Sequence, residues 1–239
     1  MKFHIPIQFG LGLVFVFFHA AHAQAPAINF TAKSANVVES GTPIKINLLR
    51  WSTDQERKTI VDIMDPNAKP TAPAPGGGAR GGGGRGGRAA QLDPDDPALA
   101  GLDGTRGGRG RGEAAKPPDP IATLTGQLSK ATTVGYLWTN EVVGYPIKFA
   151  CRTPLPDGGE RIILATDRRL GAGTAGWKVK AAGNPTDYEF TLIEIRMNAK
   201  GLGEGKTSLT AKVILDKEAN TIAVENYAAT PAILLNVAR

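Results

Sequence analysis

Apolar and polar residues alternate with period two along several stretches of the chain, and this pattern predicts β-strands with one buried face. An early stretch places Ile44, Ile46 and Leu48 on one side. Most later stretches are joined by short polar connections, which favour antiparallel neighbours. The pattern therefore predicts an antiparallel meander that forms a curved or barrel-like sheet. Its later strands are expected within residues 143–151, 162–166, 188–197, 209–215, 222–224 and 233–237.

Some of these strands carry specific expectations about which side chains are buried. Alternate positions of one strand are expected to share a single face: Val143, Tyr145, Ile147, Phe149 and Cys151. The last strand should bury Ile233, Leu235 and Val237 in the same way. Residues 198–205 are expected to form the turn that leads into the strand near Leu209.

Two helices interrupt the strand pattern. The first begins after Ser52 or Thr53, either of which fits a capping box, and it ends before Pro66. The second begins at Pro120 with Asp119 as its N-cap, and its apolar residues recur at helical spacing: Ile121, Leu124 and Leu128. We expect the two helices to cover an open face or one end of the sheet, which makes the fold α+β.

Residues 66–120, between the two helices, have a different composition. The block from Gly76 to Arg88 contains nine glycines and three arginines, and aliphatic residues are scarce throughout. Such a segment buries too little apolar area to offset its conformational entropy, so we predict a disordered insert. It contains no aromatic residue and includes acidic residues, which favours a solvated tether over specific nucleic-acid binding. The globular domain then comprises residues 24–65 and 121–239.

The first 23 residues have the pattern of a signal peptide. Lys2 precedes an apolar run from Ile5 to Phe18, and Ala21-His22-Ala23 fits the small-x-small cleavage pattern. The run is shorter than the ~20 apolar residues of a membrane-spanning helix, and no second long apolar segment follows. We therefore predict an exported protein, periplasmic or extracellular, that does not span the membrane. Gln24 rather than cysteine follows the cleavage site, so a lipoprotein is not expected.

Cleavage after residue 23 removes all three histidines and lowers the formal net charge from +6 to +5, because Lys2 is lost. Without histidine, the Ser-His-Asp and Cys-His types of catalysis and the usual zinc sites are excluded. Cys151 is the only cysteine, so it forms no intramolecular disulfide and no thiolate cluster. We interpret it as a buried apolar residue rather than a reactive thiol. No catalytic residue, cofactor or metal site is predicted.

Two glycine motifs resemble nucleotide-binding loops without their context. Gly205-Lys206-Thr207 lacks the glycine that a phosphate-binding loop needs five residues earlier, where Lys200 stands, and we expect a hairpin turn there. Gly171, Gly173 and Gly176 have the dinucleotide-binding spacing, but no helix pattern follows them, and a glycine-rich loop is expected.

The carboxylates offer one enzymatic alternative. Asp167 lies at a predicted strand end, and Glu194 lies within a predicted strand. Glycoside hydrolysis needs only two carboxyl groups about 5 to 9.5 Å apart, so a carboxylate-dependent glycan hydrolase remains open. The spacing in the sequence places no such pair across a cleft.

Aromatic residues near predicted element ends are the candidate ligand-binding residues: Trp51, Tyr136, Trp138 and Trp177, with Tyr145 in the same group. Their ring faces are suited to stacking on a sugar or a peptide. Packing in the core, or a hydrophobic staple at Trp51, is the alternative.

Three local strings carry a resemblance. Leu48-Leu49-Arg50-Trp51-Ser52 leads into the first helix, Pro154-Leu155-Pro156-Asp157-Gly158-Gly159 precedes Ile162 to Arg168, and a hairpin runs from Tyr188 to Lys206. Together they resemble an exported bacterial protein family with no assigned activity. The resemblance implies secretion and a compact domain, and it transfers no catalytic residue.

From these observations we expect an exported, non-enzymatic binding or structural protein of the bacterial cell envelope. Its expected partner is an envelope glycan, peptide or protein, with no specific nucleic acid among its ligands. The glycan hydrolase is the alternative. Nothing in the sequence indicates the oligomeric state.

Overall fold

The computed structural model describes residues 27–68, 119–180 and 185–239. The predicted signal peptide lies outside the described residues, as does nearly all of the predicted insert. At the two edges of that insert, residues 66–68 form a turn after the first helix and Pro120 begins the second.

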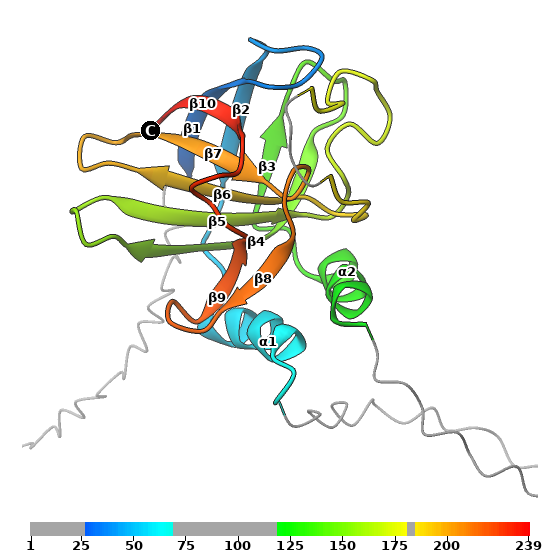
Figure 1. The fold of residues 1–239 in the computed structure, drawn as a ribbon, viewed down its shortest axis with the longest axis vertical. Coiled ribbons are helices and arrows are strands. Elements are labelled where there is room, and N and C mark those ends of the chain that lie inside the picture. The colour runs from blue at the N-terminus through cyan, green and yellow to red at the C-terminus, as the bar shows by residue number, and fades with distance from the viewer. Residues whose placement is uncertain (1–26, 69–118, 181–184) are drawn as a thin grey trace, which may run out of the picture.

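Eight antiparallel strands close into a barrel (Figure 1). Each strand pairs with the next one around the barrel, and β1 pairs with both β2 and β10, so that no edge is left open. The predicted antiparallel, barrel-like meander is therefore confirmed. In chain order the barrel strands are β1 (Ile28–Ser34), β2 (Pro43–Leu48), β3 (Gly135–Trp138), β4 (Tyr145–Pro154), β5 (Glu160–Thr166), β6 (Leu192–Met197), β7 (Leu202–Thr207) and β10 (Ala232–Ala238).

The remaining elements cover one side of the barrel. Helices α1 (Asp54–Met64) and α2 (Pro120–Lys130) follow β2, as predicted, and a hairpin of β8 (Val213–Asp216) and β9 (Thr221–Val224) lies between β7 and β10. Helix α1 contacts α2, β4 and the β8–β9 hairpin. Figure 1 shows the hairpin and both helices on the lower side of the barrel.

The apolar core has two layers because the sheet is buried on both faces where these elements cover it. Inward-pointing side chains from the barrel strands fill the interior, which suits an eight-stranded barrel: among them are Phe30, Ile46, Ile147, Ile162 and Ile195. The second layer lies between the outer face of β4–β6 and the helices and hairpin: it includes Leu124, Leu128, Phe149, Ile163 and Ile222.

Helix α1 begins as one of the two predicted capping pairs requires. The backbone N–H of Glu56 donates to Thr53 Oγ1 (3.2 Å), and the N–H of Thr53 donates to Glu56 Oε2 (2.7 Å). Ser52 instead accepts a hydrogen bond from the Ala150 N–H (3.0 Å), which attaches the start of the helix to β4. Arg50 pairs with both oxygens of Glu56, and these bonds lower the pKa of that carboxyl to about 2.

The prediction that residues 143–151 share one buried face is wrong. A β-bulge shifts the pairing of β4 with β5 between Ile147 and Phe149, and one extra residue moves the following side chains to the opposite face. Tyr145 and Ile147 therefore point into the barrel, whereas Phe149 and Cys151 pack beneath the helices. Val143 precedes the strand and is exposed.

The C-terminal half contains further corrections. The strands expected at residues 188–197 and 209–215 begin only at Leu192 and Val213. Leu235 is exposed rather than buried, because the pairing of β10 with β7 shifts between Leu234 and Val237, where Asn236 adopts a positive φ of 52°. The predicted turn at residues 198–205 is shorter than expected, since β7 already begins at Leu202. Lys206 consequently lies on β7 rather than in the expected hairpin turn, and its side chain is buried.

The Cys151 thiol should react slowly in the native protein. Its side chain is 1% exposed, its Sγ lies 3.2 Å from Thr221 Oγ1, and burial raises its pKa. A bulky maleimide should therefore label the thiol quickly only after denaturation, since both access and thiolate formation are suppressed in the fold. Rapid labelling without denaturant would contradict the position given to Cys151.

Candidate functional site

The four predicted aromatic residues occupy different environments. Trp177 is 6% exposed and belongs to the barrel core. Trp51 is half-buried against the same core, with the Arg152 guanidinium 5.3 Å from its ring centre. Tyr136 and Trp138 are exposed. The structure therefore brings only Tyr136 and Trp138 together as a solvent-facing pair.

Strand β3 positions this pair. Tyr136 and Trp138 are two residues apart and point outward, while Leu137 between them points into the core. Their ring centres are 6.0 Å apart, and the ring planes are tilted by 33°. Gly144 lies beside the indole so closely that a Cβ there would be 2.8 Å from the ring of Trp138.

Three exposed valines lie on connections at the same end of the barrel as Trp138. Val142 is 97% exposed and Val143 is 63% exposed, and both belong to the connection between β3 and β4. Val38, in the connection between β1 and β2, is also exposed. We call Val38, Trp138, Val142 and Val143 the apolar patch. Together with Tyr136, it holds five of the nine large apolar side chains that are exposed in the described ranges.

Polar contacts on the inner side hold the β3–β4 connection in place. The Tyr145 hydroxyl donates to the Glu141 carboxylate (2.6 Å to Oε2) and accepts from the Gly171 N–H (2.9 Å). Burial, assisted by Glu141, raises the pKa of Tyr145 to about 12, so the hydroxyl remains a donor at neutral pH. Arg168 Nη2 donates to the Gly144 carbonyl (2.7 Å). Val142 and Val143 are therefore exposed on a loop that these hydrogen bonds hold in place.

Further hydrogen bonds join this connection to its neighbours at the same end of the barrel. Asn140 Nδ2 donates to Glu39 Oε2 (2.6 Å), and the Val38 N–H donates to the Lys178 carbonyl (3.0 Å). The β1–β2 connection, the β3–β4 connection and the segment that contains Lys178 thus form one surface, at the upper right of Figure 1. Loops positioned by a rigid scaffold are common places for binding sites.

Lysines surround the apolar patch. Lys45 is the cross-strand neighbour of Trp138, and Lys178 and Lys180 are exposed on the segment bonded to Val38. The two nearby carboxylates already have partners: Glu39 accepts from Asn140, and Glu141 accepts from Tyr145. The surface therefore combines exposed apolar side chains with three lysines and two carboxylates.

Neither of the two carboxylates considered for catalysis belongs to the apolar patch. Glu194 is fully buried under β9, where it accepts hydrogen bonds from the Val224 N–H (3.0 Å), Arg161 Nη2 (3.2 Å) and Arg196 Nη2 (2.9 Å). These donors engage both of its oxygens. Asp167 lies 3.8 Å from Arg168, at the end of β5. Glu194 is therefore part of the fold and does not face solvent.

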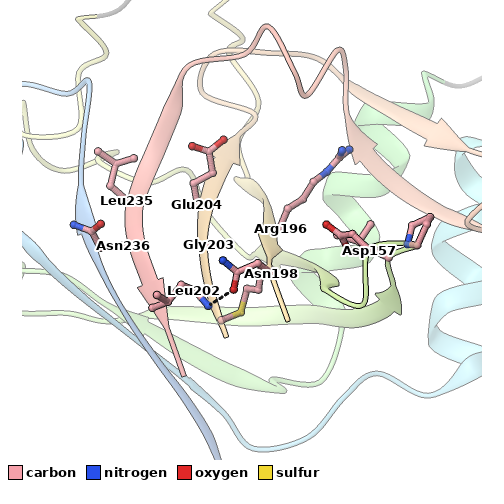
Figure 2. A pocket seen from close by; sticks show the side chains of 11 residues that line it. Asp157, Arg196, Asn198, Leu202, Gly203, Glu204, Leu235 and Asn236 are labelled. Atoms are coloured by element: carbon pink, nitrogen blue, oxygen red, sulfur yellow. Dashed lines mark hydrogen bonds between the residues drawn. The ribbon is translucent and has the colours of Figure 1, made fainter. Parts of the chain in front are cut away.

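A surface pocket of about 660 Å³ lies on the outer face of β6, β7 and β10, as Figure 2 shows. Arg196 points into it but is paired with Glu194, and the Asn198 carboxamide accepts from the Leu202 N–H (3.2 Å). Asp157 and Glu204 also line it, and Glu204 Oε1 is 3.4 Å from Lys206 Nζ. None of the four predicted aromatic residues lines this pocket.

Comparison with protein-family models, with curated proteins and with solved structures gives no match. The resemblance to an exported bacterial family stays a prediction. Among the residues that the structure describes, no helix has the length and apolar character needed to cross a membrane. Nor do the described ranges gather three or more His, Cys, Asp or Glu side chains in a group able to hold a metal ion.

The sequence pattern indicates Tyr136 and Trp138 as candidate binding residues, but it does not indicate the valines beside them. Val143 was assigned to a buried strand because it continues the alternation of Tyr145 and Ile147. The signal that separates it from the strand is Gly144, together with the polar residues 139–141 that precede the valine pair.

Proposed function

We propose that the protein is an exported, non-enzymatic binding protein of the bacterial cell envelope, and that the apolar patch is its binding face. The observation that carries this proposal is the almost complete exposure of Val142 on a connection that is anchored by Tyr145 and Arg168. Contiguous exposed apolar side chains with a polar rim are typical of interaction sites.

Two further observations support a binding role. Trp138 offers a large, rigid apolar surface beside the valines, which is the type of side chain that dominates interaction energies. The polar groups around the patch are bonded to one another, so they hold its shape without requiring a ligand. A partner would therefore bind a preformed surface.

Binding to the envelope tests the proposal. The protein from Gln24 to Arg239 should co-sediment with an envelope fraction from its host, and the double variant V142S/V143S should lose at least tenfold in affinity because burial of two valine side chains is lost. Both side chains face solvent, so the thermal midpoint should stay within a few degrees of that of the wild type.

The matched control is L202S. Leu202 is also exposed (52%), but it begins β7 at the opposite end of the barrel, so its replacement should leave co-sedimentation unchanged. Failure of the wild-type protein to bind the envelope fraction would overturn the proposed function. Equal binding by V142S/V143S would show that another surface is responsible.

The hydrolase alternative has one observation in its favour, since Asp157 and Glu204 line the same pocket. Both also take part in local bonds: Asp157 Oδ1 accepts from the Gly159 N–H (2.9 Å), and Glu204 faces Lys206. We favour the binding role because both carboxylates already have local partners, and no aromatic side chain on which a sugar could stack lines this pocket.

A further inference from the structure

We propose that the partner of the apolar patch is the surface of an anionic lipid bilayer, so that the protein binds a membrane peripherally through one end of its barrel. This inference rests on the proposed function, because it names the partner of the same face. It combines three properties of that face: protruding aliphatic side chains, a tryptophan at their base and a surrounding group of lysines.

The valines have the geometry of an interfacial anchor. Val142 and Val143 are consecutive, and both are more than half exposed, so both aliphatic groups can enter the region between headgroups and acyl chains. The two exposed aromatic rings are tilted by 33° to each other, so they do not form one flat stacking platform for a sugar. The protruding pair therefore favours a soft apolar medium over a glycan.

Trp138 lies where a membrane-bound protein would meet the headgroups. Its indole is partly exposed at the base of the valine connection, next to Gly144. Tryptophan favours the boundary between water and hydrocarbon because its ring is apolar and its N–H is polar. Insertion of the two valines would bring this ring to that boundary.

The charges complement an anionic surface. Lys45, Lys178 and Lys180 are exposed around the patch, and each lysine near an anionic membrane contributes about a fivefold gain in affinity. Two carboxylates, Glu39 and Glu141, lie at the same end and accept hydrogen bonds from the neutral groups of Asn140 and Tyr145, so the three lysines outnumber them by one. The Asp167 carboxylate is 3.8 Å from the guanidinium of Arg168, which also donates to the Gly144 carbonyl.

Vesicle binding tests the inference. The wild-type protein should co-sediment with vesicles of phosphatidylcholine mixed with phosphatidylglycerol, and the tryptophan emission should shift to shorter wavelength as Trp138 leaves water. Binding to vesicles of phosphatidylcholine alone should be much weaker. Raising the salt concentration to about 1 M, where the Debye length falls to ~3 Å, should remove most of this preference.

Two pairs of variants separate the contributions. K45Q/K178Q should weaken binding to the anionic vesicles by roughly 25-fold, whereas K58Q/K217Q, which changes the net charge equally on the helix side of the protein, should have little effect. V142S/V143S should abolish the emission shift, and L202S should preserve it.

The outcomes distinguish this inference from the proposed function. If the protein binds the envelope fraction through Val142 and Val143 but ignores both kinds of vesicle, a glycan or protein is the partner, and the membrane inference fails alone. If K58Q/K217Q weakens vesicle binding as much as K45Q/K178Q, the attraction is non-specific and the assigned face is wrong. If neither envelope nor vesicles bind, both proposals fail.

Discussion

Replacing Glu194 with alanine should lower the free energy of unfolding by roughly 3–5 kcal/mol, which is the usual cost of breaking a buried ion pair from one side. Glu194 is fully buried, and its removal leaves the Arg161 guanidinium (7% exposed) with Asp216 as its remaining carboxylate partner, at 2.7 Å. The Val224 N–H would also lose its acceptor. Chemical denaturation of the wild type and of E194A would measure the loss.

E160A is the matched control. Glu160 also pairs with an arginine, Arg239, at 2.6 Å, but both side chains are partly exposed. Solvent-exposed pairs contribute about 0–1 kcal/mol, so E160A should unfold almost as the wild type does. A loss in E194A no larger than that in E160A would mean that Glu194 does not hold the β8–β9 hairpin on the barrel.

Gly203→Ala should also destabilise the barrel strongly, by roughly 3 kcal/mol or more, because a Cβ at this position would collide with the backbone. It would overlap the Arg196 carbonyl oxygen and lie 2.8 Å from the Met197 Cα. Backbone atoms of a paired strand cannot rotate away as a side chain can, so β6 and β7 would have to separate. Thermal unfolding followed by circular dichroism would show the shift in midpoint.

The same replacement of glycine by alanine should have the opposite effect on stability at Gly126. Gly126 lies within α2, and a Cβ there would meet nothing within 4 Å. Alanine is favoured over glycine inside a helix by about 0.5–1 kcal/mol, so G126A should be more stable than the wild type. If G203A were as stable as G126A, the close contact between β6 and β7 would be wrong.

Periodicity was a good guide wherever a segment had one buried face and followed it without interruption. Ile44, Ile46 and Leu48 are buried on one side of β2, as expected. The Thr53–Glu56 capping box and the Asp119-Pro120 start were both predicted, because caps depend on residues within one turn of the helix. The burial of Cys151 was also predicted correctly.

The corrections arise where neighbouring strands decide the conformation. The bulges at residues 147–149 and 235–236 each place an extra residue in one strand, which turns the subsequent side chains to the other face. β7 was missed because Gly203 and Gly205 do not alternate as apolar residues, although their small size permits the close packing of β7 against β6 and β10. The burial of Val143 was likewise expected from alternation alone, which does not show where β4 begins.

The sequence by itself determined the class of the fold, the two capped helices, the antiparallel meander and a short list of aromatic residues, because each of these depends on neighbours within a few positions. Only the tertiary structure decided that β1 and β10 close the barrel, and that Trp177 lies inside it while Trp138 stays outside. It also decided that Val38 joins Val142 and Val143 at one end. These outcomes depend on pairing between residues far apart in the sequence, such as Thr31 with Ala238 and Lys45 with Trp138, and no local pattern specifies the register of such pairs.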